Sequence, residues 1–457
     1  MISGHTNYLL GEHVEFSRWK QAVAEAYKVY GFLPFESRLV ERATDLEKKG
    51  GLAKEIYAIK PYHKDSGYKE KSLESSTLCL PFDHTVPFAL FLANNPDTKL
   101  PLRRQDLGYS WRVEKPEPGR FNAFVQADVD IIDRNLNVFA EMECILAIVK
   151  ALEALKIPPI TVYLNDIGIA KGLVTKMGFD TDEKKEQALK VVDKLDKMSF
   201  EEAVSEIMAL EPAEGKSTVS SLVEVFKYKG NMEKFVKMYQ KDSRFGSEFM
   251  EQINTLRELV GLLEASEVDP SILQFCPGMV RGLDYYTGVV FETYLNDAPH
   301  RGSIASGGRY NNLVSAVANE SQAKALADIQ GFGGSIGLTR LFDVTMREGM
   351  VDVRLKTSSK VMICQRKVRD AAEKKALTGK AIQLAGRVRA LKIPTELYTN
   401  SSHRTGKQLG YADDKGIPVV VMVMSEGSFV IKKMYDSTQS DVDTVDKVVS
   451  HIEKMFE

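Results

Sequence analysis

Polar and apolar side chains alternate along the segment DLGYSWRVE (106–114). Because successive side chains of a strand point to opposite faces, Ser110, Arg112 and Glu114 share one face of a predicted strand. The other face, which we expect to pack in the core, carries Leu107, Tyr109, Trp111 and Val113. A guanidinium beside acids is typical of sites that bind phosphates, carboxylates and ammonium groups.

The segment AFVQADVDII (123–132) alternates in the same way, and the turn-rich residues 115–119 separate it from the first segment. Its polar face carries Phe124, Gln126, Asp128 and Asp130. Acids, an amide and an accessible ring are the groups that hold a zwitterion and a stacked base. We predict an antiparallel hairpin whose polar faces form a wet, concave floor. Alternation alone leaves open a plain hairpin with one solvated face.

A third group lies in RGLDYYTGVVFETY (281–294), where the pattern predicts a strand from about Gly282 to Tyr294. Arg281 precedes it, and Tyr285 and Tyr286 fall on opposite faces, so that one tyrosine could serve the core and the other a ligand. Which of the two contacts a ligand is left open.

Two glycine-rich segments follow, SGGRY (306–310) and GFGGSIGLTRL (331–341). Glycine allows the backbone to approach a ligand closely, although tight turns are the simpler interpretation. The chain contains no P-loop motif, and Ile336 interrupts the dinucleotide fingerprint in the second segment. A nucleotide, if one binds, must be held in another way.

Hydrophobic periodicity predicts the elements that position these residues. It predicts an amphipathic helix over 14–30, strands over 100–135 and an inserted helical domain in the Lys/Glu-rich stretch 172–265. After residue 355 it predicts a small α/β domain. That domain has strands at 361–364, 395–399 and 418–424, helices ending near 391 and 415, and a closing helix over 442–456.

Composition excludes several classes of protein. The chain has 457 residues, a net charge of -2 and 27% charged residues, which indicates a multidomain globular protein without a generally basic surface for nucleic acid. Its four cysteines are scattered and form no zinc-finger pattern. No apolar run reaches the roughly 20 residues that cross a bilayer. We expect a cytoplasmic protein that does not enter membranes, and leave import into an organelle open.

Four ordered motifs resemble those of the class II histidyl-tRNA synthetases. RGLDYYTGVVFE resembles the histidine-specific signature of that family, WRVEKPEPGRFNAFVQADVDI (111–131) its motif 2, GGSIGLTRL (333–341) its motif 3, and LPFDHTVPFA (80–89) its substrate-binding turn. HRTGKQLGYADDKGIPVVVMV (403–423) resembles its anticodon-binding domain, where His403, Arg404 and Lys407 could meet RNA phosphates.

The resemblance implies an α+β fold: a class II synthetase core on an antiparallel sheet with a helical insertion, plus a C-terminal α/β anticodon-binding domain. The implied domains are 1–171 (first part of the core), 172–265 (insertion), 266–350 (second part of the core) and 355–457 (anticodon binding). We expect a homodimer.

The resemblance also implies the roles of individual residues. The catalytic residues would be Arg112 and Arg281, which hold the α-phosphate and the carboxylate of histidine. Histidine would be bound by Asp83, Thr85, Arg112, Gln126, Asp130, Arg281, Tyr285 and Tyr286. ATP would be bound by Arg112, Glu114, Arg120, Phe124 and Arg340, with Phe124 stacked on adenine and Arg340 at the γ-phosphate. Mg²⁺ would be carried mainly by the ATP phosphates.

The implied activity is that of a histidine-tRNA ligase, with histidine, ATP and histidine tRNA as partners. One alternative is a catalytically silent, synthetase-like regulator that senses histidine or uncharged tRNA, although Arg112, Arg120, Arg281 and Arg340 are all present. A class II synthetase for threonine, proline or glycine would lack the RGLDYYTG segment. A binding module without chemistry would consume no ATP.

Overall fold

A computed structural model describes residues 2–47, 56–59, 77–239, 247–282, 286–351, 353, 356–425 and 427–456. Contacts along the chain separate it into two compact units, residues 1–6 with 20–350 and residues 7–19 with 351–457. The four domain boundaries drawn from the sequence remain predictions. Tyr285, one of the predicted histidine-binding residues, lies outside the described residues.

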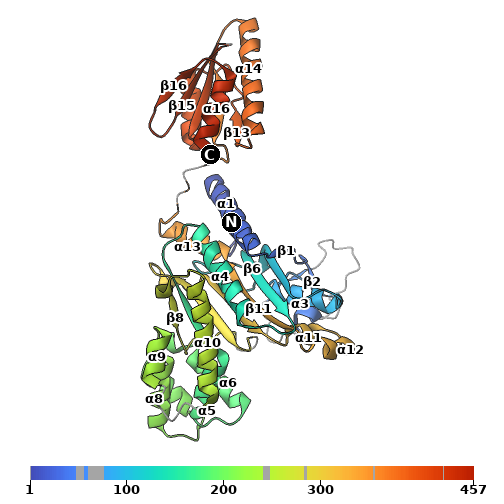
Figure 1. The fold of residues 1–457 in the computed structure, drawn as a ribbon, viewed down its shortest axis with the longest axis vertical. Helices are drawn as coiled ribbons and strands as arrows, with labels where there is room; N and C mark the ends of the chain where they lie inside the picture. The colour runs from blue at the N-terminus through green and yellow to red at the C-terminus, as the bar shows by residue number, and fades with distance from the viewer. Residues whose placement is uncertain are drawn as a thin grey trace. The chain divides into compact units, whose positions relative to one another are not determined.

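An eight-stranded, largely antiparallel sheet forms the centre of the first unit (Figure 1). Only the edge pairs β1–β5 and β7–β8 are parallel among its strand pairs. Its strands, in spatial order, are β1 (Leu33–Pro34), β5 (Leu102–Trp111), β6 (Ala123–Asp133), β11 (Gln330–Gly337), β10 (Ala305–Tyr310), β9 (Val289–Leu295), β7 (Ile160–Asp166) and β8 (Leu273–Phe275). A smaller sheet contains β2 (Glu41–Arg42), β4 (Leu78–Cys79) and β3 (Ala58–Ile59).

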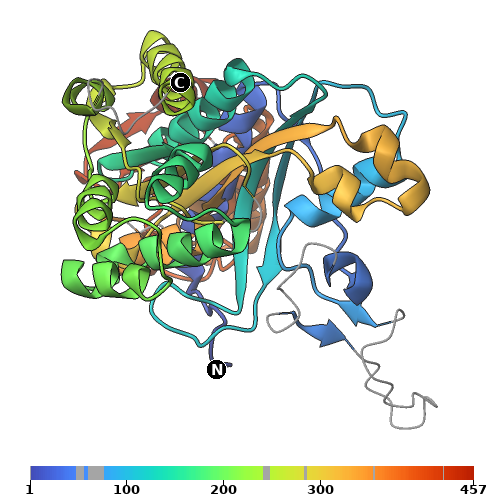
Figure 2. The same cartoon turned by 90° about the horizontal axis from the view of Figure 1, so that it is seen from below.

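Helices cover this sheet and fill the interval between β7 and β8. Helix α4 (Val138–Ala154) packs on β6, β10 and β11, and α10 (Ser247–Ala265) packs on α4 (Figures 1 and 2). The predicted first helix is confirmed as α1 (Leu10–Val29). The remaining helices are α2 (Ala43–Glu47), α3 (Thr85–Asn94), α5 (Ile167–Lys176), α6 (Asp182–Val192), α7 (Phe200–Met208), α8 (Lys216–Phe226), α9 (Met232–Tyr239), α11 (Leu313–Val317), α12 (Glu320–Ala323) and α13 (Leu338–Arg347). Short 3-10 turns span Leu195–Lys197, Pro270–Ile272, Pro299–Arg301 and Lys324–Leu326.

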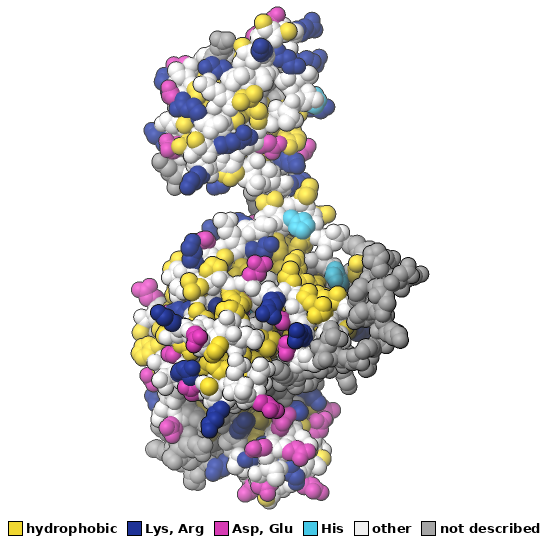
Figure 3. Space-filling view, turned by 90° about the vertical axis from the view of Figure 1, so that its right-hand side faces the viewer, with side chains coloured by type: hydrophobic (Ala, Val, Ile, Leu, Met, Phe, Trp, Pro, Cys, Tyr) yellow, Lys and Arg dark blue, Asp and Glu magenta, His cyan; other side chains and the backbone are white. Residues whose placement is uncertain are grey.

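The predicted hairpin is confirmed as β5 and β6, but the faces of β5 are not arranged as expected. Tyr109 is 46% exposed and Val113, just beyond the strand, is 44% exposed, so this side is not a buried core face. The polar residues of the other side, Arg104, Asp106 and Ser110, are buried instead. Burial of Arg104 and Asp106 is tolerated because they pair with each other, and Asp106 pairs also with Ser37 and His84. The hydroxyl of Ser110 has no hydrogen-bond partner among the described residues. Hydrophobic side chains also reach the surface on the face drawn in Figure 3.

The prediction that a strand begins near Gly282 is wrong, because β9 begins at Val289. The N–H of Tyr286 donates to the carbonyl of Gly282 at 2.8 Å, and Gly282 has a φ of 68°. Glycine tolerates this left-handed conformation without steric cost. Tyr286 therefore precedes the strand and does not belong to it.

The second unit is a five-stranded sheet with helices on both faces. The strand order is β13 (Thr395–Leu397), β12 (Val361–Gln365), β14 (Val419–Ser425), β15 (Ser428–Lys433) and β16 (Gln439–Val442). Helices α14 (Ala371–Ala390) and α16 (Val445–Phe456) form one hydrophobic core with the sheet. Helix α15 (Thr405–Lys415) forms a second core with it. The predicted strands and helices are confirmed, except that β15 and β16 were missed and Val442 ends β16 rather than opening the last helix.

Candidate active site

One cavity of about 540 Å³ collects the residues singled out from the sequence. Its floor is formed by β6, β10 and β11, and its rim by the segment before α3, the loop after β5, and residues around Gly282. Every predicted site residue that the structure describes lines it: Asp83, Thr85, Arg112, Glu114, Arg120, Phe124, Gln126, Asp130, Arg281, Tyr286 and Arg340. Convergence of these residues on one cavity makes it the candidate active site.

The glycine-rich segments form the floor strands β10 and β11, so their interpretation as tight turns is wrong. Gly333 lies opposite Asp130, and a β-carbon there would be 2.0 Å from Oδ1 of Asp130. A β-carbon on Gly307 would lie 2.2 Å from the carbonyl oxygen of Gly333. Both distances are far inside van der Waals contact, so the glycines provide the space in which the acidic side chains and a ligand fit.

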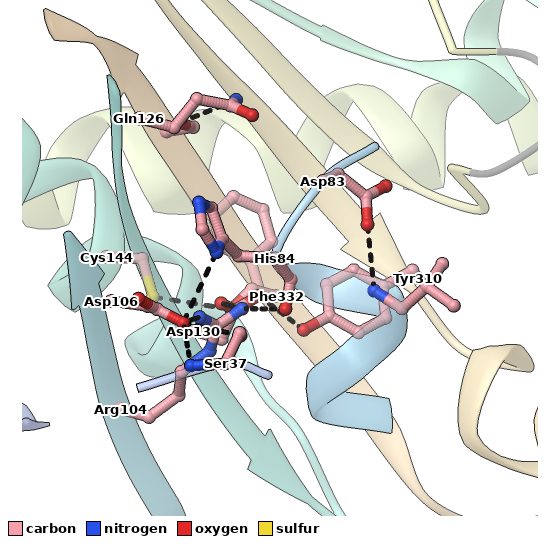
Figure 4. Close-up of polar contacts among 12 residues, drawn as sticks. Ser37, Asp83, His84, Arg104, Asp106, Gln126, Asp130, Cys144, Tyr310 and Phe332 are labelled. Atoms are coloured by element: carbon pink, nitrogen blue, oxygen red, sulfur yellow. Dashed lines mark hydrogen bonds and ion pairs between the residues drawn. The ribbon is translucent and has the colours of Figure 1, made fainter. Parts of the chain in front are cut away.

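A network of buried charges underlies one end of the cavity (Figure 4). Arg104, with 1% of its surface exposed, places Nη2 at 2.8 Å from Oδ2 of Asp130 and Nη1 at 3.5 Å from Oδ2 of Asp106. The hydroxyl of Tyr310 donates to Oδ1 of Asp130 at 2.5 Å. Arg104 thus fixes Asp130 in the cavity from beneath.

His84 and Ser37 complete this network around Asp106. The hydroxyl of Ser37 donates to Oδ2 of Asp106 at 2.5 Å, and Nδ1 of His84 lies 3.4 Å from the same oxygen. Burial disfavours charge on both His84 and Asp106, yet their close approach raises the pKa of His84 and lowers that of Asp106. The imidazolium and carboxylate forms therefore support each other.

Asp128 is a further buried acid in the cavity wall, flanked along β6 by Gln126 and Asp130. Burial raises its pKa to about 6, although His84 and Arg104 act in the opposite direction. Sequence reasoning placed Asp128 on the polar face of its strand but assigned it no role. No role was predicted for Arg104, Asp106, His84 and Tyr310. Alternation continued back from Ser110 would have placed Arg104 and Asp106 on the same face.

The opposite end of the cavity is cationic. The guanidinium of Arg112 lies 4.2 Å from the ring centroid of Phe82 and 5.2 Å from that of Phe124. Burial lowers the pKa of Arg340, and the nearby Arg120 and Arg281 lower it further. Nε of Arg340 is buried without a hydrogen-bond partner among the described residues. Several arginines close together, one of which has an N–H group without a hydrogen-bond partner, form a site that suits a polyanion.

Arg281 stands at the edge of this cationic end. Its side chain is 53% exposed and forms ion pairs with the buried Glu292 at 3.3 Å and with Asp193 at 3.8 Å. Asp193 is the C-cap of α6, so a helix from the segment between β7 and β8 contacts the predicted catalytic arginine.

The loop between β5 and β6 carries Glu114 and Arg120, whose side chains lie 3.9 Å apart at the cavity rim. The side-chain amide of Asn122 donates to the carbonyls of Arg112 and Glu114, both at 2.9 Å. The backbone N–H of Asn122 donates in turn to the carbonyl of Gly4 at 2.7 Å. These bonds fix the base of the loop beside the cavity.

Comparison with known proteins decides the family. The family model described as histidyl-tRNA synthetase matches residues 11–340, more than two thirds of the chain. The chain belongs to the histidyl-tRNA synthetase family. A curated relative, the histidine–tRNA ligase of Bifidobacterium longum subsp. infantis, is 32% identical over 434 residues, which cover 92% of this chain and 88% of the relative. The histidine–tRNA ligase of Cytophaga hutchinsonii is 29% identical over 446 residues and 94% of each chain.

Solved structures of histidyl-tRNA synthetases share the fold. That of the Nostoc sp. PCC 7120 enzyme aligns with a TM-score of 0.84 and 22% identity, covering 100% of this chain and 99% of that one. A Bacillus halodurans protein described as an ATP phosphoribosyltransferase regulatory subunit/histidyl-tRNA synthetase aligns with a TM-score of 0.70 and 17% identity. The predicted fold class is therefore confirmed.

Within the described ranges, no three His, Cys, Asp or Glu side chains gather in an arrangement that could hold a metal ion. No helix in the described part of the chain combines the length and apolar character needed to span a bilayer.

Proposed function

We propose that the chain activates L-histidine with ATP to form histidyl-adenylate and pyrophosphate, and then transfers histidine to the 3′ end of its tRNA. The observation that carries this proposal is the division of charge within one cavity. Buried carboxylates lie at one end and four arginines, Arg112, Arg120, Arg281 and Arg340, at the other. A zwitterionic amino acid and a triphosphate together match that division.

In the proposed complex, histidine lies at the acidic end. Asp83, Thr85, Gln126 and Asp130 bind its amino group, and Tyr285 and Tyr286 contact its imidazole ring. Polar recognition of the ring nitrogens would reject amino acids with apolar side chains, because a partner group would be left buried and unpaired. Arg112 and Arg281 face the carboxylate.

ATP lies at the cationic end with its phosphates toward the arginines. Phe124 stacks on adenine, Glu114 and Arg120 contact the nucleotide, and Arg340 holds the γ-phosphate. The unpartnered Nε of Arg340, in an environment that lowers the pKa of this arginine, supports this placement. Mg²⁺, bound mainly by the phosphates, would neutralise further negative charge.

The chemistry needs no protein nucleophile. A carboxylate oxygen of histidine attacks the α-phosphorus, a new P–O bond forms, and the bond to the pyrophosphate oxygen breaks. Because both reactants are anionic, Arg112 and Arg281 hold them in contact and stabilise the charge that develops in the transition state. A terminal ribose hydroxyl of the tRNA then attacks the carbonyl carbon of the adenylate, and AMP leaves.

The other parts of the molecule serve this reaction. We propose a catalytic core in residues 1–171 and 266–350, a helical insertion at 172–265 and an anticodon-binding domain at 355–457. His403 and Arg404, directly before α15, would contact RNA phosphates together with Lys407 in that helix. We also propose a homodimer that works in the cytoplasm. The partly exposed apolar side of β5 supports a protein interface.

A charging assay tests the function. Purified protein would be incubated with ATP, Mg²⁺, labelled histidine and total tRNA, and acid-precipitable label would be counted. We expect label on tRNA only when ATP is present, with one AMP formed per histidine transferred. Folded protein that binds histidine but forms neither AMP nor charged tRNA would instead support the regulator.

A further inference from the structure

The acidic end of the cavity contains one carboxylate for which the proposed function has no role. Asp128 is 4% exposed and lines the cavity. It lies on the same face of β6 as Gln126 and Asp130, two residues on either side of it along the strand. Both of those residues are proposed to bind the amino group of histidine, so Asp128 lies between two substrate contacts.

Asp128 has one oxygen engaged and one free. Its side chain is hydrogen-bonded to Ser335, its cross-strand neighbour on β11. The hydroxyl of Ser335 also accepts a hydrogen bond from Nε2 of Gln126 at 3.1 Å, which leaves its proton for Asp128. Oδ1 of Asp128 is buried and has no hydrogen-bond partner among the described residues. A buried acceptor without a donor is costly, and a ligand could supply the missing donor.

The positive charges of His84 and Arg104 attract Asp128, but neither residue forms an ion pair with it. Arg104 is paired with Asp106 and Asp130, and His84 faces Asp106. Among the described residues, Asp128 has no ion pair with any lysine, arginine or histidine. The protein therefore leaves a buried acid that a cation from outside would neutralise.

We propose that Asp128 is a substrate-binding residue whose carboxylate accepts a hydrogen bond from the α-ammonium group of histidine. The inference rests on the proposed function and adds a contact to its histidine site. The ammonium group is favoured over the imidazole ring for two reasons. It stays charged at neutral pH, whereas imidazole is largely neutral there, and it carries three donors, enough for Asp128 in addition to its neighbours.

One inhibitor that has the amino group and one that lacks it test this contact, and they differ also in that histidinol carries a hydroxymethyl group in place of the carboxylate. Histidinol retains the ammonium group and the imidazole ring, whereas 3-(imidazol-4-yl)propionate lacks the amino group. Their inhibition constants would be measured against histidine-dependent pyrophosphate exchange for the unaltered chain and for Asp128→Asn. We expect the substitution to weaken histidinol about 10-fold or more, the usual effect of losing a hydrogen bond to a charged group. Inhibition by the deaminated analogue and the KM for ATP should stay within about twofold.

Asp133→Asn provides the matched control, because Asp133 ends the same strand, lies outside the cavity lining and accepts a hydrogen bond from the N–H of Arg134. It should leave both inhibition constants unchanged. Asp128→Ser, which is smaller and neutral, replaces Asp128→Asn if the latter fails to fold.

Equal weakening of both inhibitors by the Asp128 substitution would mean that Asp128 only shapes the site, and no weakening of either would exclude the contact. Either result overturns the inference and leaves the proposed function standing. An unaltered, folded chain without histidine-dependent exchange would instead overturn the proposed function, and this contact with it.

Discussion

Arg104 is the cation around which the acidic end of the active site is built. It is fully enclosed, pairs with Asp106 and Asp130, and donates from Nη2 to the carbonyl of His84 at 3.0 Å. Its guanidinium also lies 4.6 Å from the ring centroid of Phe88. The residues proposed to bind ligands could be identified from motifs, whereas Arg104 could not. Apart from Asp106 on the same strand, its partners come from β6 and from the segment that holds His84 and Phe88. A single strand pattern cannot show which of these charges will meet.

Replacing Arg104 by methionine, which keeps much of its length, should strongly destabilise the protein. Asp130 would be left buried without a counter-ion and Asp106 with His84 alone. Breaking a buried pair in this way costs about 3–5 kcal/mol. Urea unfolding would measure the loss. Arg134→Met is the control, since Arg134 pairs with the exposed Asp328 at the surface and should change little. A stable Arg104→Met protein would show that the buried network contributes little to folding.

The difference in the free energy of unfolding between Asp128→Asn and the unaltered chain should depend on pH. The folded-state pKa of Asp128 is raised to about 6 from 3.8, so the folded protein binds an extra proton between these values. In the unaltered chain this group's contribution therefore favours folding below about pH 4 and is lost as pH rises through 6. The variant should gain up to about 3 kcal/mol relative to the unaltered chain between pH 4 and pH 7.

Denaturation of both proteins at several pH values would measure this difference. A gap in stability that stays constant with pH would contradict a raised pKa for Asp128.

Removing the guanidinium of Arg281 should impair catalysis while leaving the fold intact. The side chain is half exposed, and its ion pairs with Asp193 and Glu292 are not enclosed on all sides. We expect Arg281→Ala to lower kcat of adenylate formation about 100-fold or more, as loss of a transition-state donor typically does. Single-turnover kinetics would measure the rate, with Arg347→Ala on the surface of α13 as the control. Unchanged kcat would remove Arg281 from the mechanism.

At the scale of elements, the sequence predicted the kinds of strand and helix better than their faces. Alternation located β5 and β6, but the polar side of β5 was assigned to solvent although Arg104, Asp106 and Ser110 are buried. Hydrophobicity alone cannot anticipate a polar face that is buried because its groups satisfy one another. The hairpin of β15 and β16 was missed for a related reason. The edge strand β16 has the polar sequence QSDV, and β15 beside it is short and ends in two lysines, so hydrophobicity gives little sign of either strand.

The glycines of the floor strands β10 and β11 are a requirement at this scale. In Gly333→Ala the new methyl group would lie within 2.0 Å of the present position of Asp130 Oδ1, so Asp130 must move from Arg104. We expect the KM for histidine to rise about 10-fold or more, with a loss of about 1–3 kcal/mol in stability from overpacking. Exchange kinetics and thermal unfolding would measure the two effects.

Gly379→Ala in α14 is the matched substitution, since a β-carbon there would have nothing within 4 Å. It should leave exchange unchanged and stabilise the helix by about 0.5–1 kcal/mol. Equal behaviour of the two alanine variants would show that the floor does not need its glycines.

At the scale of the whole molecule, the order of the motifs along the chain predicted the fold class and the family, while the folded chain supplied their convergence. Segments around residues 83, 112, 126, 281 and 340 meet at one cavity in the first unit. Each motif alone had a plausible structural explanation, because distance along a chain does not reveal proximity in space. The sheet order β6–β11–β10–β9, in which β11 returns to lie between β6 and β10, brings them together.

Pyrophosphate exchange into ATP, with each of the common amino acids offered in turn and without tRNA, tests the central claim that this cavity activates histidine. We predict Mg²⁺-dependent exchange with histidine and none above background with any other amino acid. Exchange with a different amino acid would contradict the assignment of the acidic end to histidine. Absence of exchange with every amino acid, in protein whose circular dichroism shows it to be folded, would contradict an active synthetase.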